Sequence, residues 1–321
     1  MQTPLTRDHD QTPRGTARKP SKSAQPVSRR RVLRLVGGAG AVVAVAAVGG
    51  GIARAVDQGV FSTGEGAVYA AWSDVPATDG ENPLSLVQAA ILAANAHNTQ
   101  PWLFRVEESG INLYADTTRG TGANDPLGRE LMVSLGCALE NLMVAAGPNG
   151  FATTLTLLPN PADATHVARV DLTPATPAVS ALYDAIPDRH TNHAAFEDTP
   201  LAPEVLSMMA DLNDDADVAI VWLTSPEAKL GFSELTIAAT EAFIADTEQS
   251  VDSFAWWRGD WDELQRRKDG ITMDAAGLPA LTRALGKIMP DLSRSAFDES
   301  WLKCTRDPQL SSAAAFGVIV A

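Results

Sequence analysis

The chain has 321 residues, enough for one large domain or two smaller ones with a sizeable hydrophobic core. Apolar residues make up 45% of the sequence and charged residues 20%, which indicates a folded protein and excludes a disordered or collagen-like one. The formal net charge of −14 argues against a nucleic-acid partner.

The charge is unevenly distributed along the chain. Residues 1–55 hold ten of the 25 Lys and Arg side chains but only two of the 39 Asp and Glu side chains. The rest of the chain is therefore a strongly acidic body, and the basic segment in front of it has a separate role.

This N-terminal segment has the composition of a targeting signal. Ser28, Arg29 and Arg30 precede an almost uncharged run of Ala, Val and Gly over residues 35–52, and small residues follow at 53–55. The pattern resembles the twin-arginine export signal, which implies the export machinery as a partner and a domain outside the cytoplasm. The alternative is an uncleaved membrane anchor with a basic cytoplasmic flank. In both cases we expect contact with a membrane only through this segment.

The remaining sequence mixes short helical and extended patterns. Apolar periodicity predicts helices over residues 84–94, 131–146, 178–185 and 227–246, and strands over residues 102–106, 111–115, 151–158, 166–172 and 218–223. This mixture predicts an α+β fold, with residues 56–81 as a linker. Residues 316–321 form a further apolar strand with no turn after it, so we expect the chain to be incomplete at this end.

Two further features carry open alternatives. Trp256, Trp257 and Trp261 lie among charged residues, which suggests a cover over a flat ligand, or else a helix packed on the core. Cys137 and Cys304 are too few for a disulfide framework or a zinc site, and no metal is expected. Free thiols are favoured over a single bridge.

A first cluster of candidate site residues lies between a predicted helix and a predicted strand. It contains Asn95, His97, Asn98 and Gln100. Carboxamides and an imidazole present donors and acceptors without fixed charge, as the polar edge of a flavin or a base requires. The alternative is a polar turn whose amides cap the preceding helix.

A second cluster follows the helix predicted over residues 178–185. It contains Arg189, His190, Thr191 and His193. Arginine can bind phosphate through two hydrogen bonds, the threonine hydroxyl adds a donor, and protonated histidines add charge. In an acidic body this is a candidate anion site. The alternative is a surface ion pair of Arg189 with Asp188 or Glu197.

Both clusters resemble motifs of the nitroreductase family. The first resembles its Pro-Ser-x-x-Asn-x-Gln-Pro-Trp-x-Phe flavin-binding loop, matched at Asn98, Gln100, Pro101, Trp102 and Phe104, although Ala94 and Asn95 replace the Pro-Ser opening. The second resembles its Arg-Arg/His-Ser/Thr-x-Arg/Lys motif, with His193 where Arg or Lys is usual.

A third match covers the long predicted helix. Its residues are Asp125, Pro126, Arg129, Glu130, Ser134, Gly136, Ala138, Asn141 and Leu142. With the other two motifs, it is similar to the single-chain Acg-like branch of the family over roughly residues 82–321.

The resemblance implies a fold and a function. Ordinary nitroreductases have the two flavin motifs in the opposite order and form dimers, so the reversed order implies two nitroreductase-like halves, residues 82–180 and 181–321, packed as a pseudo-dimer with one FMN site. Such enzymes transfer a hydride from NAD(P)H through flavin N5 to a nitroaromatic or quinone-like acceptor, and no protein group need act as acid, base or nucleophile.

Two rival interpretations stay open. Because NAD(P)H is scarce outside the cytoplasm, one rival is a protein that sequesters FMN without turnover. Because His193 and the missing Pro-Ser opening depart from the family's motifs, the other is a structural surface protein whose flavin site has decayed.

Overall fold

The computed structural model describes residues 50–73, 82–213 and 215–321. The twin-arginine pattern at residues 28–34 lies outside these ranges. Residues Gly51–Ala321 form one compact unit. No helix in the described part of the chain is both long and apolar enough to span a bilayer.

The largest sheet of the described residues is antiparallel and four-stranded, with strand order β1-β2-β4-β3. Its strands are β1 (Trp102–Glu107), β2 (Gly110–Ala115), β3 (Phe151–Leu157) and β4 (His166–Pro174). The turn between β1 and β2 is where the sequence predicts it, since Glu107 pairs with Gly110. Prediction and structure agree to within about two residues for all four strands.

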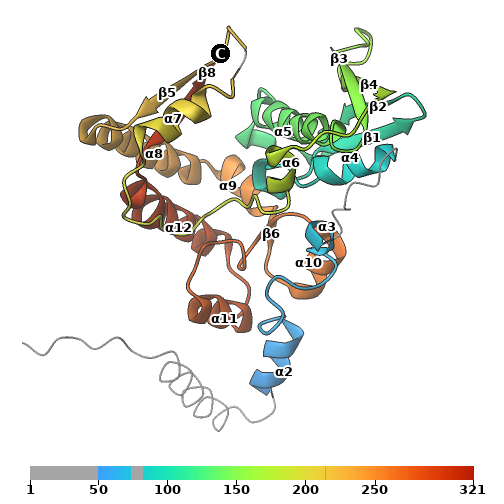
Figure 1. The fold of residues 1–321 in the computed structure, drawn as a ribbon. Coiled ribbons are helices and arrows are strands. Elements are labelled where there is room, and N and C mark those ends of the chain that lie inside the picture. The colour runs from blue at the N-terminus through green and yellow to red at the C-terminus, as the bar shows by residue number, and fades with distance from the viewer. Residues whose placement is uncertain (1–49, 74–81, 214) are drawn as a thin grey trace, which may run out of the picture. The chain divides into compact units, whose positions relative to one another are not determined.

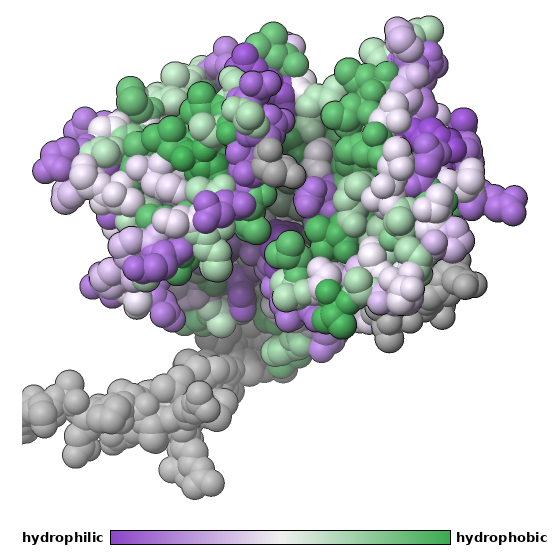
Figure 2. Space-filling view, turned by 45° about the horizontal axis from the view of Figure 1, so that its top comes forward, coloured by the Kyte–Doolittle hydropathy of each residue, from purple (hydrophilic) through white to green (hydrophobic). Residues whose placement is uncertain are grey.

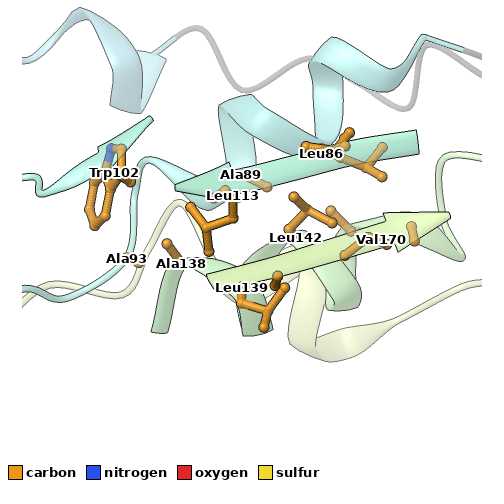
Figure 3. Close-up of a cluster of buried hydrophobic side chains, with 14 of the residues drawn as sticks. Leu86, Ala89, Ala93, Trp102, Leu113, Ala138, Leu139, Leu142 and Val170 are labelled. Atoms are coloured by element: carbon orange, nitrogen blue, oxygen red, sulfur yellow. The ribbon is translucent and has the colours of Figure 1, made fainter. Parts of the chain in front are cut away.

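The hydrophobic core lies between this sheet and two helices, α4 (Pro83–Ala90) and α5 (Arg129–Ala146). Figure 3 shows Leu86 of α4 and Leu142 of α5 among the side chains of β2 and β4. Leu86, Leu113 and Leu142 are almost fully buried. Each such side chain contributes about 1.5–3 kcal/mol on burial, so this core fixes the position of the loop that joins α4 to β1.

The remaining helices are α2 (Gly50–Asp57), α3 (Ala70–Ser73), α6 (Ala181–Ala185), α7 (Pro203–Ala210), α8 (Pro226–Ala245), α9 (Thr247–Phe254), α10 (Trp261–Arg267), α11 (Ala280–Ile288) and α12 (Arg294–Cys304). Shorter helical segments are η1 (Ala96–Asn98), η2 (Thr117–Arg119), η3 (Gly122–Asn124) and η4 (Thr305–Leu310). Two more strand pairs are present, β5 (Ala219–Leu223) with β8 (Phe316–Val320), antiparallel, and β6 (Trp257–Arg258) with β7 (Ile271–Thr272), parallel (Figure 1).

The fold is α+β, as predicted, but its two parts differ. Among the described residues, those before residue 190 form the four-stranded sheet and most of the buried core, whereas few apolar residues after that point are buried. Leu230 and Leu235 of α8, for example, are exposed, and Figure 2 shows apolar patches on the surface. The pseudo-dimer therefore stays a prediction.

The cysteines, the first predicted helix and the predicted linker can also be compared with the structure. Cys137 and Cys304 are free, as predicted, and both are half-buried. The helix expected over residues 84–94 ends earlier, at Ala90, because the chain turns at Leu92 and Ala93 toward the first motif. Part of the expected linker is anchored to the body, since the Lys287 ammonium donates to the Gly59 carbonyl at 3.0 Å.

Candidate functional site

The first motif forms a strained loop between α4 and β1. His97, Asn98 and Gln100 all have positive φ, at 49°, 52° and 52°. For His97 and Gln100 this left-handed conformation costs roughly 1–2 kcal/mol each, whereas asparagine tolerates it better. Strain of this kind is retained where surrounding contacts enforce it, and it is common at ligand-binding sites.

Hydrogen bonds within the loop and to helix α5 hold the loop in place. The Asn95 carboxamide oxygen accepts the backbone N–H of Gln100 at 2.7 Å, and the backbone N–H of Ala96 donates to the Ser134 hydroxyl at 3.1 Å. Trp102 of the same motif is buried in the core (Figure 3). Asn95 therefore shapes the loop and does not present its oxygen outward.

Residues 268–270, which are far from the loop in sequence, form hydrogen bonds with its side chains. The Gln100 carboxamide donates to the Lys268 carbonyl at 2.6 Å, and the Asn98 carboxamide donates to the Gly270 carbonyl at 3.3 Å. The Gly270 N–H donates in turn to the Asn98 carbonyl at 3.1 Å. The alternative of amides capping the preceding helix is thus wrong for Asn98 and Gln100.

Three charged side chains reinforce this junction. Arg119 donates to the Thr99 carbonyl at 2.5 Å and to the Asp269 carboxylate at 2.6 Å. The other Asp269 oxygen accepts from Arg258 at 2.9 Å, and both Asp269 and Arg258 are buried. We refer to Arg119, Asp269 and Arg258 as the ionic clamp. The sequence analysis missed these residues, because 150 positions separate Arg119 from Asp269.

His97 extends the site toward α9 and α12. Its Nε2 lies 3.0 Å from the Ser253 hydroxyl, and its ring makes an edge contact with Trp301. Burial lowers the pKa of His97 below its ordinary value, so the ring is neutral at physiological pH. His97 thus offers hydrogen-bonding groups without charge.

Arg189 of the second motif reaches the chain just before the strained loop. It donates to the Leu92 carbonyl at 3.0 Å and to the Thr191 hydroxyl at 3.4 Å. Its Nε is buried and has no hydrogen-bond partner among the described residues. Among the described residues, Arg189 forms no ion pair with Asp188 or Glu197. The alternative of a surface ion pair is therefore not observed.

The other residues of the second motif lie farther along the same surface. The His190 ring lies on Trp72, with 4.4 Å between ring centroids, and the Arg189 guanidinium also faces Trp72. The backbone of His193 contacts Gly277 so closely that a Cβ there would meet its carbonyl carbon at 2.3 Å. Within the described ranges, no hydrogen bond joins residues 190–193 to residues 95–100.

The tryptophan-rich segment is only partly helical: Trp257 lies in strand β6 and Trp261 begins α10. Trp256 faces the guanidinium groups of Arg119 and Arg258, at 5.7 and 5.5 Å from its centroid. Trp261 in α10 packs against Gly59 and beneath Lys287. Trp261 thus fits the alternative of a packed helix. Across residues 50–73, 82–213 and 215–321, no group of three or more His, Cys, Asp or Glu is placed to hold a metal.

Comparison with known proteins identifies relatives but no matching family model. Two proteins of Mycobacterium tuberculosis H37Rv that carry the name "Putative NAD(P)H nitroreductase" are each 34% identical to the chain. The match to Rv3131 spans 134 residues, 41% of this chain and 39% of that protein; the match to acg spans 178 residues, 54% and 53%. An uncharacterized protein of the same organism, Rv3127, is 27% identical over 185 residues, 54% of this chain and 52% of its own length.

The chain therefore spans about half the length, or less, of the curated relatives it matches. The chain is thus similar in sequence to proteins that carry the name of nitroreductases.

Proposed function

We propose that the chain is an FMN-binding oxidoreductase of the nitroreductase type that uses NAD(P)H as electron donor. The observation that carries the proposal is the strained loop of residues 97–100, which matches the flavin-binding motif and has Arg189 beside its entry. Relatives named for NAD(P)H nitroreductase activity support the same class.

The residues at this site suit FMN in kind. The phosphate needs a cation and hydroxyl donors, and Arg189 supplies a buried Nε without a partner in the described chain, next to the Thr191 hydroxyl. The flavin ring needs neutral donors and acceptors, which Asn98, Gln100 and the uncharged His97 provide. We assign the phosphate to Arg189 and Thr191, and the polar edge of the ring to the loop.

The remaining motif residues have supporting roles in this proposal. Asn95 fixes the loop through its bond to the Gln100 N–H. His190, in contact with Trp72, keeps the Arg189 segment in place, and the resemblance implies that His193 takes the place of the motif's final Arg or Lys. FMN, when bound, supplies the redox chemistry by taking a hydride at N5 from NAD(P)H and passing electrons to a nitroaromatic or quinone-like acceptor. The protein binds and orients the reactants.

The proposal includes one FMN per chain, because each half contributes one of the two motifs. It also includes export through the twin-arginine machinery, with the body outside the cytoplasm and only the N-terminal segment at the membrane.

Purification of the protein from a flavin-sufficient host tests the proposal. We expect a flavin absorption spectrum, a mass of one FMN per chain by native mass spectrometry, and bleaching by anaerobic NADPH. A colourless protein that takes up no added FMN would contradict the flavin assignment. A flavin that NADPH fails to bleach would contradict the enzymatic assignment and favour FMN sequestration.

A further inference from the structure

A cavity of about 400 Å³ lies beside the ionic clamp. Its walls come from the segment after β2 and from the segment between α9 and β7, and they include Arg119, Trp256, Arg258 and Arg267. Pockets that bind small molecules have volumes of roughly 300–1,000 Å³, so the cavity is large enough for a ligand of that kind.

Two guanidinium groups on this cavity retain a free donor. Arg119 uses Nε and Nη2 for the Thr99 carbonyl and Asp269, and Arg258 uses Nε and Nη1 for Asp269 and two carbonyls. In the described part of the chain, Nη1 of Arg119 and Nη2 of Arg258 have no hydrogen-bond partner. Asp269 places the two groups side by side because it binds both.

Three arginines and two aspartates line the cavity, a net formal charge of +1 in an otherwise acidic body. Both oxygens of Asp269 are already bonded to the clamp, and one oxygen of Asp252 accepts the backbone N–H of Ala123. Among the described residues, Arg267 of the lining forms an ion pair only with Glu263, one turn away in α10, and its side chain is 53% exposed. Surface pairs of this kind contribute only about 0.3–0.5 kcal/mol, so Arg267 can turn to a stronger anion.

Trp256 adds an aromatic surface to the same wall. Its ring is half-buried and lies against both clamp guanidinium groups. Trp256 lines the cavity, and an indole ring can stack on a planar ligand, as tryptophan does with nucleic-acid bases.

We propose that this cavity binds a phosphate-bearing ligand with a planar ring, the chemistry of a nucleoside monophosphate. The phosphate contacts Arg119, Arg258 and Arg267, and the ring lies on Trp256. Arginine is suited to phosphate because its planar group offers several donors in fixed directions. The site uses neither Arg189 nor the carboxamides of the strained loop, so its ligand and FMN would not compete for the same groups.

The test is calorimetric titration of the full chain with AMP, inorganic phosphate and benzoate, with and without FMN. We expect AMP to bind more tightly than phosphate, and phosphate more tightly than benzoate, whether or not FMN is present. Arg267→Gln should weaken AMP binding by about tenfold, as expected for the loss of one charge-assisted contact. Arg266→Gln, at the neighbouring exposed position of α10, is the matched control and should change it less than twofold. Trp256→Leu should remove the advantage of AMP over phosphate.

Several outcomes would overturn the inference. Absence of AMP and phosphate binding at millimolar concentration excludes the site, and equal losses in Arg267→Gln and Arg266→Gln assign the effect to general charge. Competition between AMP and FMN would show that AMP occupies the flavin site. Tighter binding of benzoate than of phosphate would exclude the phosphate assignment.

Discussion

The side chain of Gln100 donates a hydrogen bond to the backbone carbonyl of Lys268 at 2.6 Å, across 168 residues of sequence. This contact joins a loop of the first motif to a segment that no motif marked. It places the carboxamide of Gln100 in one orientation and supports a backbone conformation that is otherwise unfavourable. The geometry of the candidate flavin loop thus depends on residues 268–270.

The ionic clamp should contribute strongly to stability. Asp269→Asn leaves Arg258, whose side chain is 4% exposed, without its carboxylate, and breaking a buried ion pair in this way costs about 3–5 kcal/mol. We expect the free energy of unfolding in urea to fall by about 3 kcal/mol. Asp262→Asn, at an exposed position of α10, is the control and should change it by less than about 0.5 kcal/mol. Equal effects of the two substitutions would show that the clamp does not stabilise the fold.

His97 should make the protein less stable in acid. Burial lowers its pKa in the folded state, so below the unfolded value of about 6.5 the unfolded chain binds this proton more readily than the folded one does. Its contribution to stability is therefore complete above pH 6.5 and is lost as the pH falls, by at most about 1.4 kcal/mol per pH unit.

His97→Asn removes this proton and retains a residue that tolerates positive φ. Urea unfolding between pH 8 and pH 5 should show a smaller loss of stability for the variant than for the wild type. His193, whose pKa is also lowered, is present in both proteins and cancels in the difference. Parallel pH profiles would exclude His97 as the titrating group.

The sequence predicts the first part of the fold better than the second, for a physical reason. The strands β1, β2 and β4 and helix α5 place apolar residues at buried positions of the core, whereas β3 adds only the half-buried Phe151. The helices α9 to α12 bury few apolar residues; α11 has an amphipathic pattern, but its Leu281 and Leu285 are exposed. A local signal was available for α10, since Asp260 caps it by accepting the Glu263 N–H.

The candidate site, too, is only partly predictable from the sequence. The motif residues Asn98, Gln100 and Arg189 stand out in the sequence because polar residues gather where an element ends. Arg119, which bonds to that loop, and Asp269 and Arg258, which support Arg119, have no local signal, since their role depends on tertiary contacts. Spatial proximity of this kind requires coordinates.

Export should depend on the paired arginines. Arg29→Lys combined with Arg30→Lys keeps the charge of the segment but removes the pair that the twin-arginine route reads. We expect the double variant to accumulate in the cytoplasm, and Arg31→Lys, at the variable position of the pattern, to be exported like the wild type. Cell fractionation with an antibody against the body measures both, and normal export of the double variant would contradict the prediction.

The proposed phosphate role of Arg189 gives the most direct test of the flavin assignment. Titration of the apoprotein with FMN and with riboflavin, which lacks the phosphate, separates binding of the phosphate from support of the fold. Removal of a charge-assisted partner costs about 2 kcal/mol or more, so Arg189→Ala should weaken FMN binding by roughly 30-fold or more and leave riboflavin binding nearly unchanged. Equal losses for the two ligands would contradict the account, because Arg189 would then act on the fold through its bond to Leu92 and not on the phosphate.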